Sequence, residues 1–180
     1  MANEILLKSG TPIVWADVTD YSSSGSGFTR TNQINMESLA NNAARQGAKA
    51  DLGATRAASY SVIVGWESGT APTAGNRVDY YWSCSFSATA GTGNEGGASG
   101  SDASYKSGEE AEWVKQLIFI GSLVLTNDGA GTVQRKCINN NFIPPMRYGM
   151  PIVHNVSGQT SDTDAIQMYI ALVPNIDEIQ

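Results

Sequence analysis

The chain has 180 residues, the size of one domain that can bury a core without metals or a disulfide framework. Only 16% of its residues are charged and the net charge is −6, which argues against nucleic acid as a partner because phosphate binding needs clustered Lys and Arg. It has neither a basic and apolar leader of the secretory type nor a run of about 20 apolar residues, so we expect no export signal and no membrane span.

The first part of the chain predicts short extended elements and one helix. Residues 1 to 30 are expected to form an N-terminal extension, with strands at residues 4 to 7 and 12 to 16. Residues 37 to 46 are the one helical candidate, but the apolar face of that helix is mostly alanine. We therefore expect a short connecting helix that contributes little to the core.

Alternation of apolar and polar residues is clearest at residues 59 to 66, where Tyr60 and every second residue up to Trp66 fall on one face. This pattern predicts a strand that turns that face toward the core. A turn at residues 71 to 76 and an aromatic strand at residues 77 to 86 follow, so the two strands are predicted to form a hairpin.

The second half of the chain predicts four further strands. The apolar run at residues 115 to 126 predicts a central strand buried on both faces, and the strand at residues 132 to 138 is its expected partner. After Pro144 and Pro145, strands are predicted at residues 150 to 156 and 165 to 173.

Short strands without regular alternation of strand and helix predict an all-β sandwich or barrel, in a single domain over residues 1 to 180. We expect about seven to nine strands and at most one short helix. A Gly-rich stretch makes residues 87 to 112 a long exposed loop. Loops of that length are uncommon unless they carry function or are ordered by a partner.

The side chains that carry chemistry are few. His154 is the single histidine, and no G-x-S-x-G motif accompanies it, so we expect a hydrogen-bonded structural residue and no catalytic group. Cys84 and Cys137 match no zinc or redox spacing; each is expected to be a small core residue, and a disulfide between the two sheets stays open.

Two groups of loop oxygens could bind calcium, namely Asp102 with Asn94 and Glu95, and Asp162 with Asp164. Neither follows the calcium-loop spacing, so we interpret both as solvated loop residues. The chain also lacks a zinc-ligand cluster and a phosphate-binding glycine motif, and we therefore expect no metal and no cofactor.

Glu109 and Glu112 lie next to Trp113, and paired carboxylates can hydrolyse glycosides when they are suitably separated. These carboxylates are close in sequence and surface-like, so we expect no enzyme. The four tryptophans could instead form a sugar-stacking platform, which favours an alternative function as a carbohydrate-binding module of a tail or fibre. Trp66 and Trp82 alternate with core positions, however, and are expected to be buried.

From Leu39 to the C-terminus the chain resembles a known family in a series of short motifs. They include Ala44-Arg45-Gln46, Asp51-Leu52-Gly53, Ala57-Ala58-Ser59-Tyr60, Pro72-Thr73-Ala74-Gly75, Val78-Asp79-Tyr80-Tyr81-Trp82, Gly121-Ser122-Leu123-Val124 and Pro144-Pro145-Met146-Arg147-Tyr148-Gly149. In these motifs the chain is similar to the capsid decoration (cement) proteins of tailed bacteriophages.

The resemblance implies a jelly-roll-like β-sandwich that binds the major capsid protein at the outer capsid surface of the virion, after synthesis in the bacterial host cytoplasm. It also implies a symmetric homo-oligomer, a dimer or a trimer. Because arginine is enriched at interfaces, we expect Arg30, Arg45, Arg56 and Arg147, together with Trp113, to contact the capsid or another subunit. Ordinary pairing of these arginines within the chain is the alternative.

Overall fold

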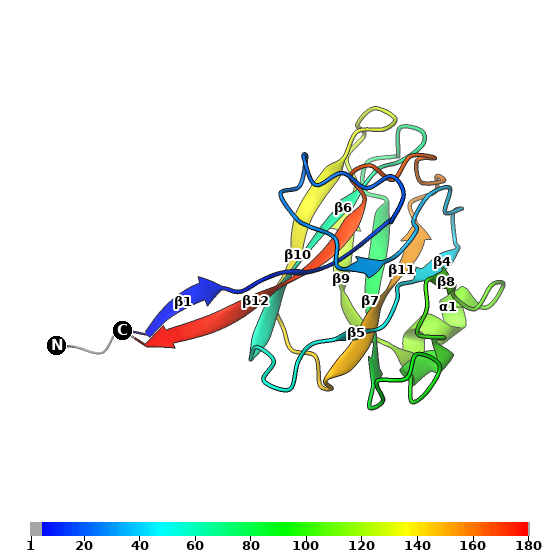
Figure 1. Ribbon diagram of the computed structural model, residues 1–180. Coiled ribbons are helices and arrows are strands. Elements are labelled where there is room, and N and C mark those ends of the chain that lie inside the picture. The colour runs from blue at the N-terminus through cyan, green and yellow to red at the C-terminus, as the bar shows by residue number, and fades with distance from the viewer. Residues whose placement is uncertain (1–4, 180) are drawn as a thin grey trace.

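The computed structural model describes residues 5 to 179 and consists of two β-sheets packed face to face, with one short α-helix (Figure 1). The strands are β1 (Ile5–Ser9), β2 (Ile13–Ala16), β3 (Asn32–Gln33), β4 (Ala44–Gln46), β5 (Ala50–Asp51), β6 (Ser59–Trp66), β7 (Arg77–Ser85), β8 (Ala103–Ser104), β9 (Ile118–Val124), β10 (Gln134–Phe142), β11 (Tyr148–Val156) and β12 (Tyr169–Ile179). The helix is α1 (Glu110–Trp113), and 3₁₀ turns occupy Glu95–Gly97 and Val114–Gln116.

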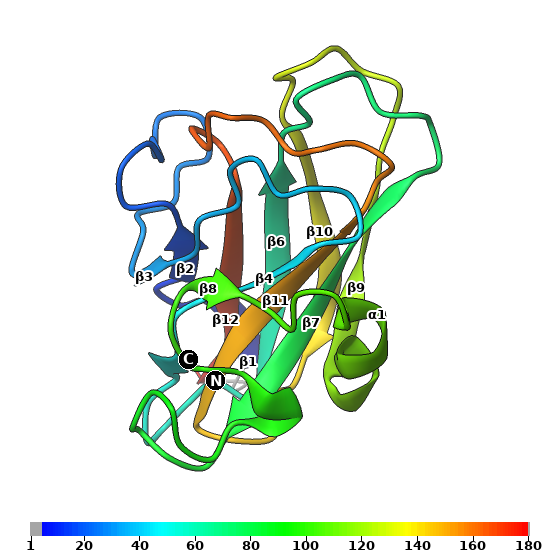
Figure 2. The ribbon, with the colours of Figure 1, turned by 90° about the vertical axis from the view of Figure 1, so that its right-hand side faces the viewer.

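The strand order is that of a jelly roll. One sheet has the order β10-β6-β12-β2-β3 with β1 added on β12, and the other has the order β8-β4-β11-β7-β9 with β5 added on β11; Figure 2 shows the two layers. Eight of these strands form two antiparallel four-stranded sheets, β10-β6-β12-β2 and β4-β11-β7-β9. Except between β7 and β9, each of the eight crosses to the other sheet before the next begins, which is the two-Greek-key arrangement of jelly rolls. The predicted fold class is confirmed.

The strand at residues 59 to 66 is found as predicted, but its predicted hairpin is wrong. β6 and β7 lie in different sheets, and β6 pairs with β10 and β12. The turn between β6 and β7 therefore spans the two layers. Local turn residues mark where a strand ends, and they do not reveal to which sheet the chain returns.

The expected central strand at residues 115 to 126 is also wrong in its position. Among the described strands, β9 pairs only with β7 and forms an edge of its sheet, with Phe119 and Val124 exposed. The expected partner β10 belongs to the other sheet and contacts β9 through a hydrogen bond from Asn139 Nδ2 to the Ile120 carbonyl oxygen, 3.1 Å long. A run of apolar residues marks burial less reliably than alternation does.

The helix predicted at residues 37 to 46 is absent. The segment forms turns and ends in β4. Ser38 and Asn42 have positive φ angles of 49° and 66°, which interrupt a right-handed helix, and Asn42 N donates to the Asn155 carbonyl oxygen instead. The polar contacts of this loop with β11 outweigh the helix propensity of its alanines.

The main core lies between the two sheets and contains three of the tryptophans. Trp15, Trp66 and Trp82 are fully buried, and Trp15 packs edge-on against Trp82 with ring centroids 5.7 Å apart. Gly149 permits this packing, since a Cβ at that position would lie 2.5 Å from the Trp82 ring. Because these large aromatic side chains fill the centre, the sandwich supports its loops on a rigid body.

A second apolar cluster lies on the outer face of the β4-β11-β7-β9 sheet. Tyr105, Val114 and Leu117 come from the chain segment before β9 and pack on Met150 and Ile152 of β11. The predicted long loop is therefore folded back on the sheet over much of its length, as Figure 2 shows for the segment around α1. Burial of Tyr105 anchors this Gly-rich segment on the sheet.

Both cysteines are free thiols. Cys84 is buried in β7, as expected of a small core residue, whereas Cys137 is exposed on β10 in the other sheet. Burial raises the pKa of the Cys84 thiol to about 12, so this thiol stays protonated at neutral pH.

Candidate interaction surface

The two ends of the sandwich differ, and we name them by their strands. The ribbon end is the end at which β7 and β10 finish and β11 begins, and the distal end is the opposite one. The name comes from a two-stranded ribbon, made of β1 and the last residues of β12, that projects from the body in Figure 1.

The ribbon has two free backbone edges. β1 pairs with β12 from Ile5 opposite Ile179 to Ser9 opposite Asn175, whereas pairing of β12 with β6 stops at Asn175. Within residues 5 to 179, no third strand pairs with β1 or with residues 176 to 179. Unpaired edges of this kind are templates for pairing with another strand.

The core row of β12 runs out of the sandwich at the root of the ribbon. Ile170 and Leu172 are fully buried, Pro174 is half-buried, and Ile176 is 42% exposed. These four residues alternate along the strand and therefore share one face. The opposite sheet ends before the row does, so the row is left uncovered at its outer end.

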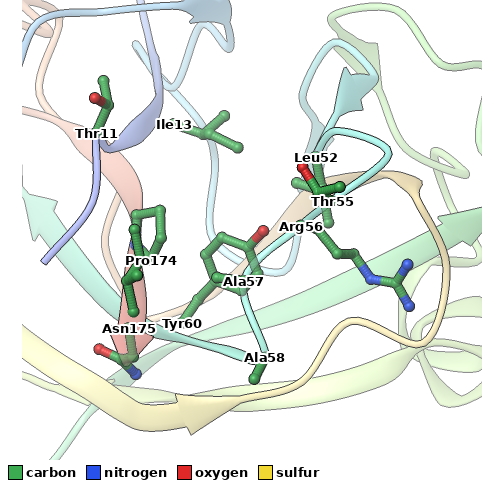
Figure 3. Close-up of a pocket in the computed structure, with 11 residues that line it drawn as sticks. Thr11, Ile13, Leu52, Thr55, Arg56, Ala57, Ala58, Tyr60, Pro174 and Asn175 are labelled. Carbon is green, nitrogen blue, oxygen red and sulfur yellow. The ribbon is translucent and has the colours of Figure 1, made fainter. Parts of the chain in front are cut away.

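A pocket of about 420 Å³ lies at this uncovered end, and we call it the root pocket. Ile13, Leu52, Tyr60 and Pro174 supply apolar parts of its lining, and Thr11, Thr55 and Asn175 supply polar ones. Figure 3 shows Arg56 across the opening from Pro174. The root pocket therefore has a mixed apolar and polar lining, with the cationic Arg56 at its edge.

Arg56 is exposed and is not neutralised by a carboxylate. Its Nη2 donates to the Pro145 carbonyl oxygen over 3.2 Å, and Figure 3 shows the side chain extending away from Pro174. Among the described residues, no carboxylate lies within ion-pair distance of it. The positive charge is available to a partner.

Arg147 lies near Arg56 but is paired within the chain. Its Nε and Nη2 donate to the two carboxylate oxygens of Asp51 over 2.7 and 2.6 Å. The guanidinium holds the pKa of Asp51 at about 2, well below its ordinary value. The expectation of pairing within the chain thus describes Arg147, while Arg56 keeps its charge free.

Large apolar side chains are exposed at the same end. Phe86 is 76% exposed and lies directly over Gly93, and Ile143 is 61% exposed just before the Pro144-Pro145 pair. Exposed aromatic and aliphatic side chains beside arginines are typical of protein interfaces.

The other predicted interface residues lie elsewhere. Arg45 Nε donates to Asp102 Oδ1 over 2.6 Å in a largely buried pair, so Arg45 holds a loop in place. Trp113 is covered by Lys106, whose Nζ lies 3.8 Å from the ring, and it donates to Glu109. Arg30 lies beside a shallow pocket at the distal end.

The site therefore combines only two of the five predicted residues, Arg56 and Arg147. They are far apart in the sequence, and no spacing pattern indicated that they would meet. The ribbon was missed as well, although strands at the two ends of the chain were predicted. A hydrophilic pair such as Asp177 and Glu178 next to isoleucines is the one sequence signal of an exposed strand.

His154 is buried on β11 and no described hydrogen bond reaches its Nε2, contrary to the expectation of a hydrogen-bonded residue. It lines a pocket of about 580 Å³ together with Glu109, Glu110 and Glu112. Glu109 accepts from Trp113 Nε1, and Glu110 accepts from the Gly108 amide. Two of these glutamates therefore bond to their own loop.

The predicted calcium groups are bonded internally. Asp102 accepts from Arg45, and Asn94 Nδ2 donates to the carbonyl oxygens of Ala90 and Ala98. Asp162 accepts from the Asp164 amide, so its oxygen caps a turn. These contacts hold loops, and they do not assemble into a set of converging ligands.

A different acidic group, not singled out from the sequence, converges at the distal end. One carboxylate oxygen from each of Asp17, Asp20 and Glu37 lies within 4.8 Å of the others. A hydrogen bond with Asp20 is the main cause that raises the pKa of Glu37, followed by burial. Such a group could hold a cation, although exposed carboxylates often gather without one.

The sugar-stacking platform suggested by the four tryptophans is not formed, because Trp15, Trp66 and Trp82 are fully buried in the core. Trp113 is the one tryptophan that is partly exposed. A carbohydrate site would have to rely on that ring alone.

Comparison of the chain with protein-family models, curated proteins and solved structures gives no match. Over the part of the chain that is described, no helix has the length and apolar character needed to cross a membrane.

Proposed function

We propose that this chain is a structural virion protein of a tailed phage, a decoration protein that binds the outer surface of the capsid and stabilises the shell. The observation that carries the proposal is the ribbon end, where a projecting ribbon, exposed apolar side chains and Arg56 lie together on a rigid jelly roll. The resemblance of residues 39 to 180 to phage decoration proteins supports the same function.

The ribbon end has the physical properties that attachment to a shell requires. Exposed Phe86 and Ile143 lose water on contact, each contributing about 1.5 to 3 kcal/mol when fully buried. Arg56 adds a charge that can pair with a carboxylate of the major capsid protein. The free edges of the ribbon offer backbone hydrogen bonds to a strand of the shell.

Binding to isolated shells tests this function directly. The purified chain is mixed with capsids that lack it, and bound protein is measured by co-sedimentation. The double change Phe86→Ser and Ile143→Ser, at the ribbon end, should weaken binding by about tenfold or more. The matched change Val18→Ser and Ile166→Ser removes similarly exposed side chains, 62% and 41%, at the distal end and should leave binding unchanged.

Electron cryomicroscopy of the particle provides the second test. Density for the jelly roll on the head shell, in hundreds of copies per particle, supports a decoration protein. Density on the tail, in a handful of copies, contradicts it. Equal loss of shell binding in both pairs of serine variants would show that the ribbon end is not the attachment surface.

A further inference from the structure

His154 carries a polar atom that the fold buries and leaves without a partner. The residue is 6% exposed, and no hydrogen bond from the described part of the chain reaches its Nε2. Asp79 lies opposite His154 on β7, but its carboxylate accepts from Arg77 and Ser122 instead. A buried polar atom of this kind destabilises a fold, and a hydrogen bond with a ligand would satisfy it.

The imidazole lies on the outer face of the β4-β11-β7-β9 sheet, at a pocket. Two residues before it in β11, Ile152 packs in the outer apolar cluster, and side chains two apart on a strand share a face. The pocket of about 580 Å³ is lined by His154 and Val156, by Asn42, and by residues 108 to 112, which include the start of α1 (Figure 2). We call it the glutamate pocket, and it shares no lining residue with the root pocket.

Three carboxylates line the glutamate pocket, those of Glu109, Glu110 and Glu112. Glu109 and Glu110 each use one oxygen, Oε2, to accept from Trp113 Nε1 and from the Gly108 amide, both over 2.9 Å. Between residues 5 and 179, no lysine or arginine lies within ion-pair distance of any of the three glutamates. The pocket is therefore negatively charged, and carboxylate oxygens are left to accept from a ligand.

Two cations from neighbouring segments are held by other groups. Lys106 Nζ lies over the Trp113 ring, 3.8 Å from its centroid. Arg77 Nε donates to both carboxylate oxygens of Asp79, over 2.9 and 3.1 Å. Neither cation lines the glutamate pocket, so the charge of the pocket is left for a ligand from outside the chain.

The charge of the pocket determines which ligand suits His154. A nitrogen of a neutral imidazole either donates or accepts a hydrogen bond. The three carboxylates repel an anion that would accept from Nε2, whereas they attract a cation that would donate to it. The pocket therefore favours a cation that carries N–H groups.

A bare metal ion fits the pocket less well than an organic cation. Metal binding requires several ligand atoms that converge on one point. Over the described residues, the group of three or more acidic or histidine ligand atoms within 4.8 Å of one another is that of Asp17, Asp20 and Glu37, which does not include His154. The volume of about 580 Å³ instead leaves room for a side chain.

The side chain of arginine matches this pocket better than that of lysine. A guanidinium directs five N–H donors outward in one plane, so it can reach acceptors that lie apart, whereas an ammonium is a compact point charge. The aliphatic stem of an arginine can pack on Val156 and Ala111, the apolar residues of the lining. Gly108, Ala111 and Glu112 are exposed, so a protein surface can approach the pocket.

We propose that the glutamate pocket receives an arginine side chain of a partner protein, whose guanidinium donates to His154 Nε2 and pairs with the carboxylates of Glu110 and Glu112. The pocket is a second interaction surface, beyond the shell attachment proposed for the ribbon end. Because His154 lies near the end of β11 that is opposite to the ribbon end, a chain attached to a capsid would keep this pocket free for the second protein.

NMR spectroscopy follows the site directly, because His154 is the single histidine of the chain and gives one set of imidazole signals. The full chain is titrated with a blocked glycine peptide that carries one central arginine. The nitrogen signal of His154 Nε2 should shift and saturate, with a dissociation constant of about 1 mM or tighter. The same peptide with citrulline, the uncharged isostere of arginine, should not bind, and the lysine peptide should bind at least about threefold more weakly.

Methylguanidinium tests whether the cation is carried by a side chain. It lacks the aliphatic stem that packs on Val156 and Ala111, so it should bind severalfold more weakly than the arginine peptide. Equal affinity would assign the pocket to a small free cation and overturn a protein partner.

Charge removal in the pocket provides the second measurement. Glu110→Gln together with Glu112→Gln should weaken binding of the arginine peptide about tenfold or more, while the new glutamine at the first site can still accept from the Gly108 amide. Asp128→Asn together with Asp164→Asn is the matched control. It changes the net charge equally, at exposed residues outside the pocket, and should leave binding unchanged.

His154→Leu removes the buried nitrogen and should abolish saturable binding, which is then followed at the amide signal of Ala111. Circular dichroism verifies that each variant keeps its β structure, and the glutamine pair tests the pocket whether or not His154→Leu folds. An arginine peptide that leaves the Nε2 signal unmoved, a citrulline peptide that binds equally well, or equal losses in the glutamine pair and its control would each overturn the arginine site.

Shell binding separates this site from the proposed function. A chain that binds capsids but not the arginine peptide overturns the arginine site alone. A chain that binds the peptide as described but binds no capsid overturns the decoration function alone.

Discussion

The two ends of the jelly roll differ in how they cover the core. At the distal end, loops that enclose the core meet on buried polar side chains, such as Asn155, Ser157 and Ser161, which hydrogen-bond to neighbouring backbone. At the ribbon end the core row continues outward to Ile176, which is 42% exposed beside a pocket lined in part by the loop at residues 52 to 58.

The two ends also differ in their charged residues. Carboxylates are numerous in the distal loops; they are Asp17, Asp20, Glu37, Glu67, Asp128, Asp162 and Asp164. The ribbon end has an unneutralised Arg56 instead. An end whose loops cover the core needs no partner. An end with exposed apolar side chains and an arginine that no carboxylate neutralises is suited to an interface.

The largest expected effect comes from breaking the distal hydrogen bonds. Asn155 Nδ2 donates to the carbonyl oxygens of Leu39 and Gln159, each over 2.8 Å, and its Oδ1 accepts from Ser157. Asn155→Ala leaves these buried groups without partners, so the free energy of unfolding should fall by about 3 kcal/mol in urea denaturation. Asn140→Ala, at an exposed asparagine on β10, is the control and should cost less than about 0.5 kcal/mol. Equal losses would mean that the distal end is not closed by this residue.

Lys49 makes a group of polar contacts at the ribbon end, and it provides the next prediction. Its Nζ donates to Ser85 Oγ and to the carbonyl oxygens of Ser87, Thr89 and Thr92, at 2.7 to 3.0 Å. Lys49→Met should destabilise the protein by about 1 to 2 kcal/mol and expose residues 86 to 94 to proteolysis. Lys115→Met is the matched exposed change. If Lys49→Met is cleaved at the same rate as the unchanged protein, Lys49 does not hold residues 86 to 94 in place.

The free energy of unfolding should be lower above the pKa of Glu67, a buried carboxylate of the distal end. Burial raises this pKa, and the carboxylates of Asp162 and Asp164 raise it further. Because the pKa is higher in the folded than in the unfolded protein, stability is full at low pH and decreases as pH rises through the folded-state pKa. Glu67→Gln should therefore stabilise the protein at pH 7 by about 1 kcal/mol and remove part of this pH dependence. Glu112→Gln, at an exposed glutamate, is the control and should have no effect. A lower melting temperature of Glu67→Gln at pH 7 would contradict the prediction.

The smallest effect on stability is expected for the exposed ion pair at the ribbon end. Arg147→Met removes both hydrogen bonds to Asp51, so the pKa of Asp51 should return from about 2 toward its ordinary value of 3.8. NMR titration of the carboxyl carbon measures this change, and the melting temperature at pH 7 should hardly move because exposed pairs contribute little. In the unchanged protein this contribution is lost progressively as pH falls from 3.8 through about 2. A pKa that stays near 2 would show that Arg147 is not its cause.

Strand positions followed from the sequence wherever one face is buried and the other is not. At β6, burial alternates from Ser59 to Val64, and both predicted bounds agree with the structure. At β9 the continuous apolar run gave no such contrast, so Phe119 was expected inside although it is exposed. Alternation of apolar and polar residues indicates which face of a strand is buried and which is exposed. A continuous apolar run does not distinguish the two faces.

Strand pairing and the interaction surface did not follow from the sequence, for a related reason. Partners in a jelly roll are distant along the chain, as with β2 and β12, and nothing near Ile13 specifies Leu172 as its neighbour. Arg56 and Arg147 come together only because β5 and the start of β11 pair at Asp51 and Tyr148. Their meeting is a result of topology, which local composition does not encode.

The central place of β12 has a consequence for how the chain folds during synthesis. β12 pairs with β1, β2 and β6, so three strands that are synthesised earlier cannot complete their pairing until β12 has been made. Until residues 169 to 179 leave the ribosome, the apolar segment at Ile5 to Leu7 has no strand beside it, and long-range pairing of this kind forms slowly. Pairing of β12 is thus the event that completes this sheet.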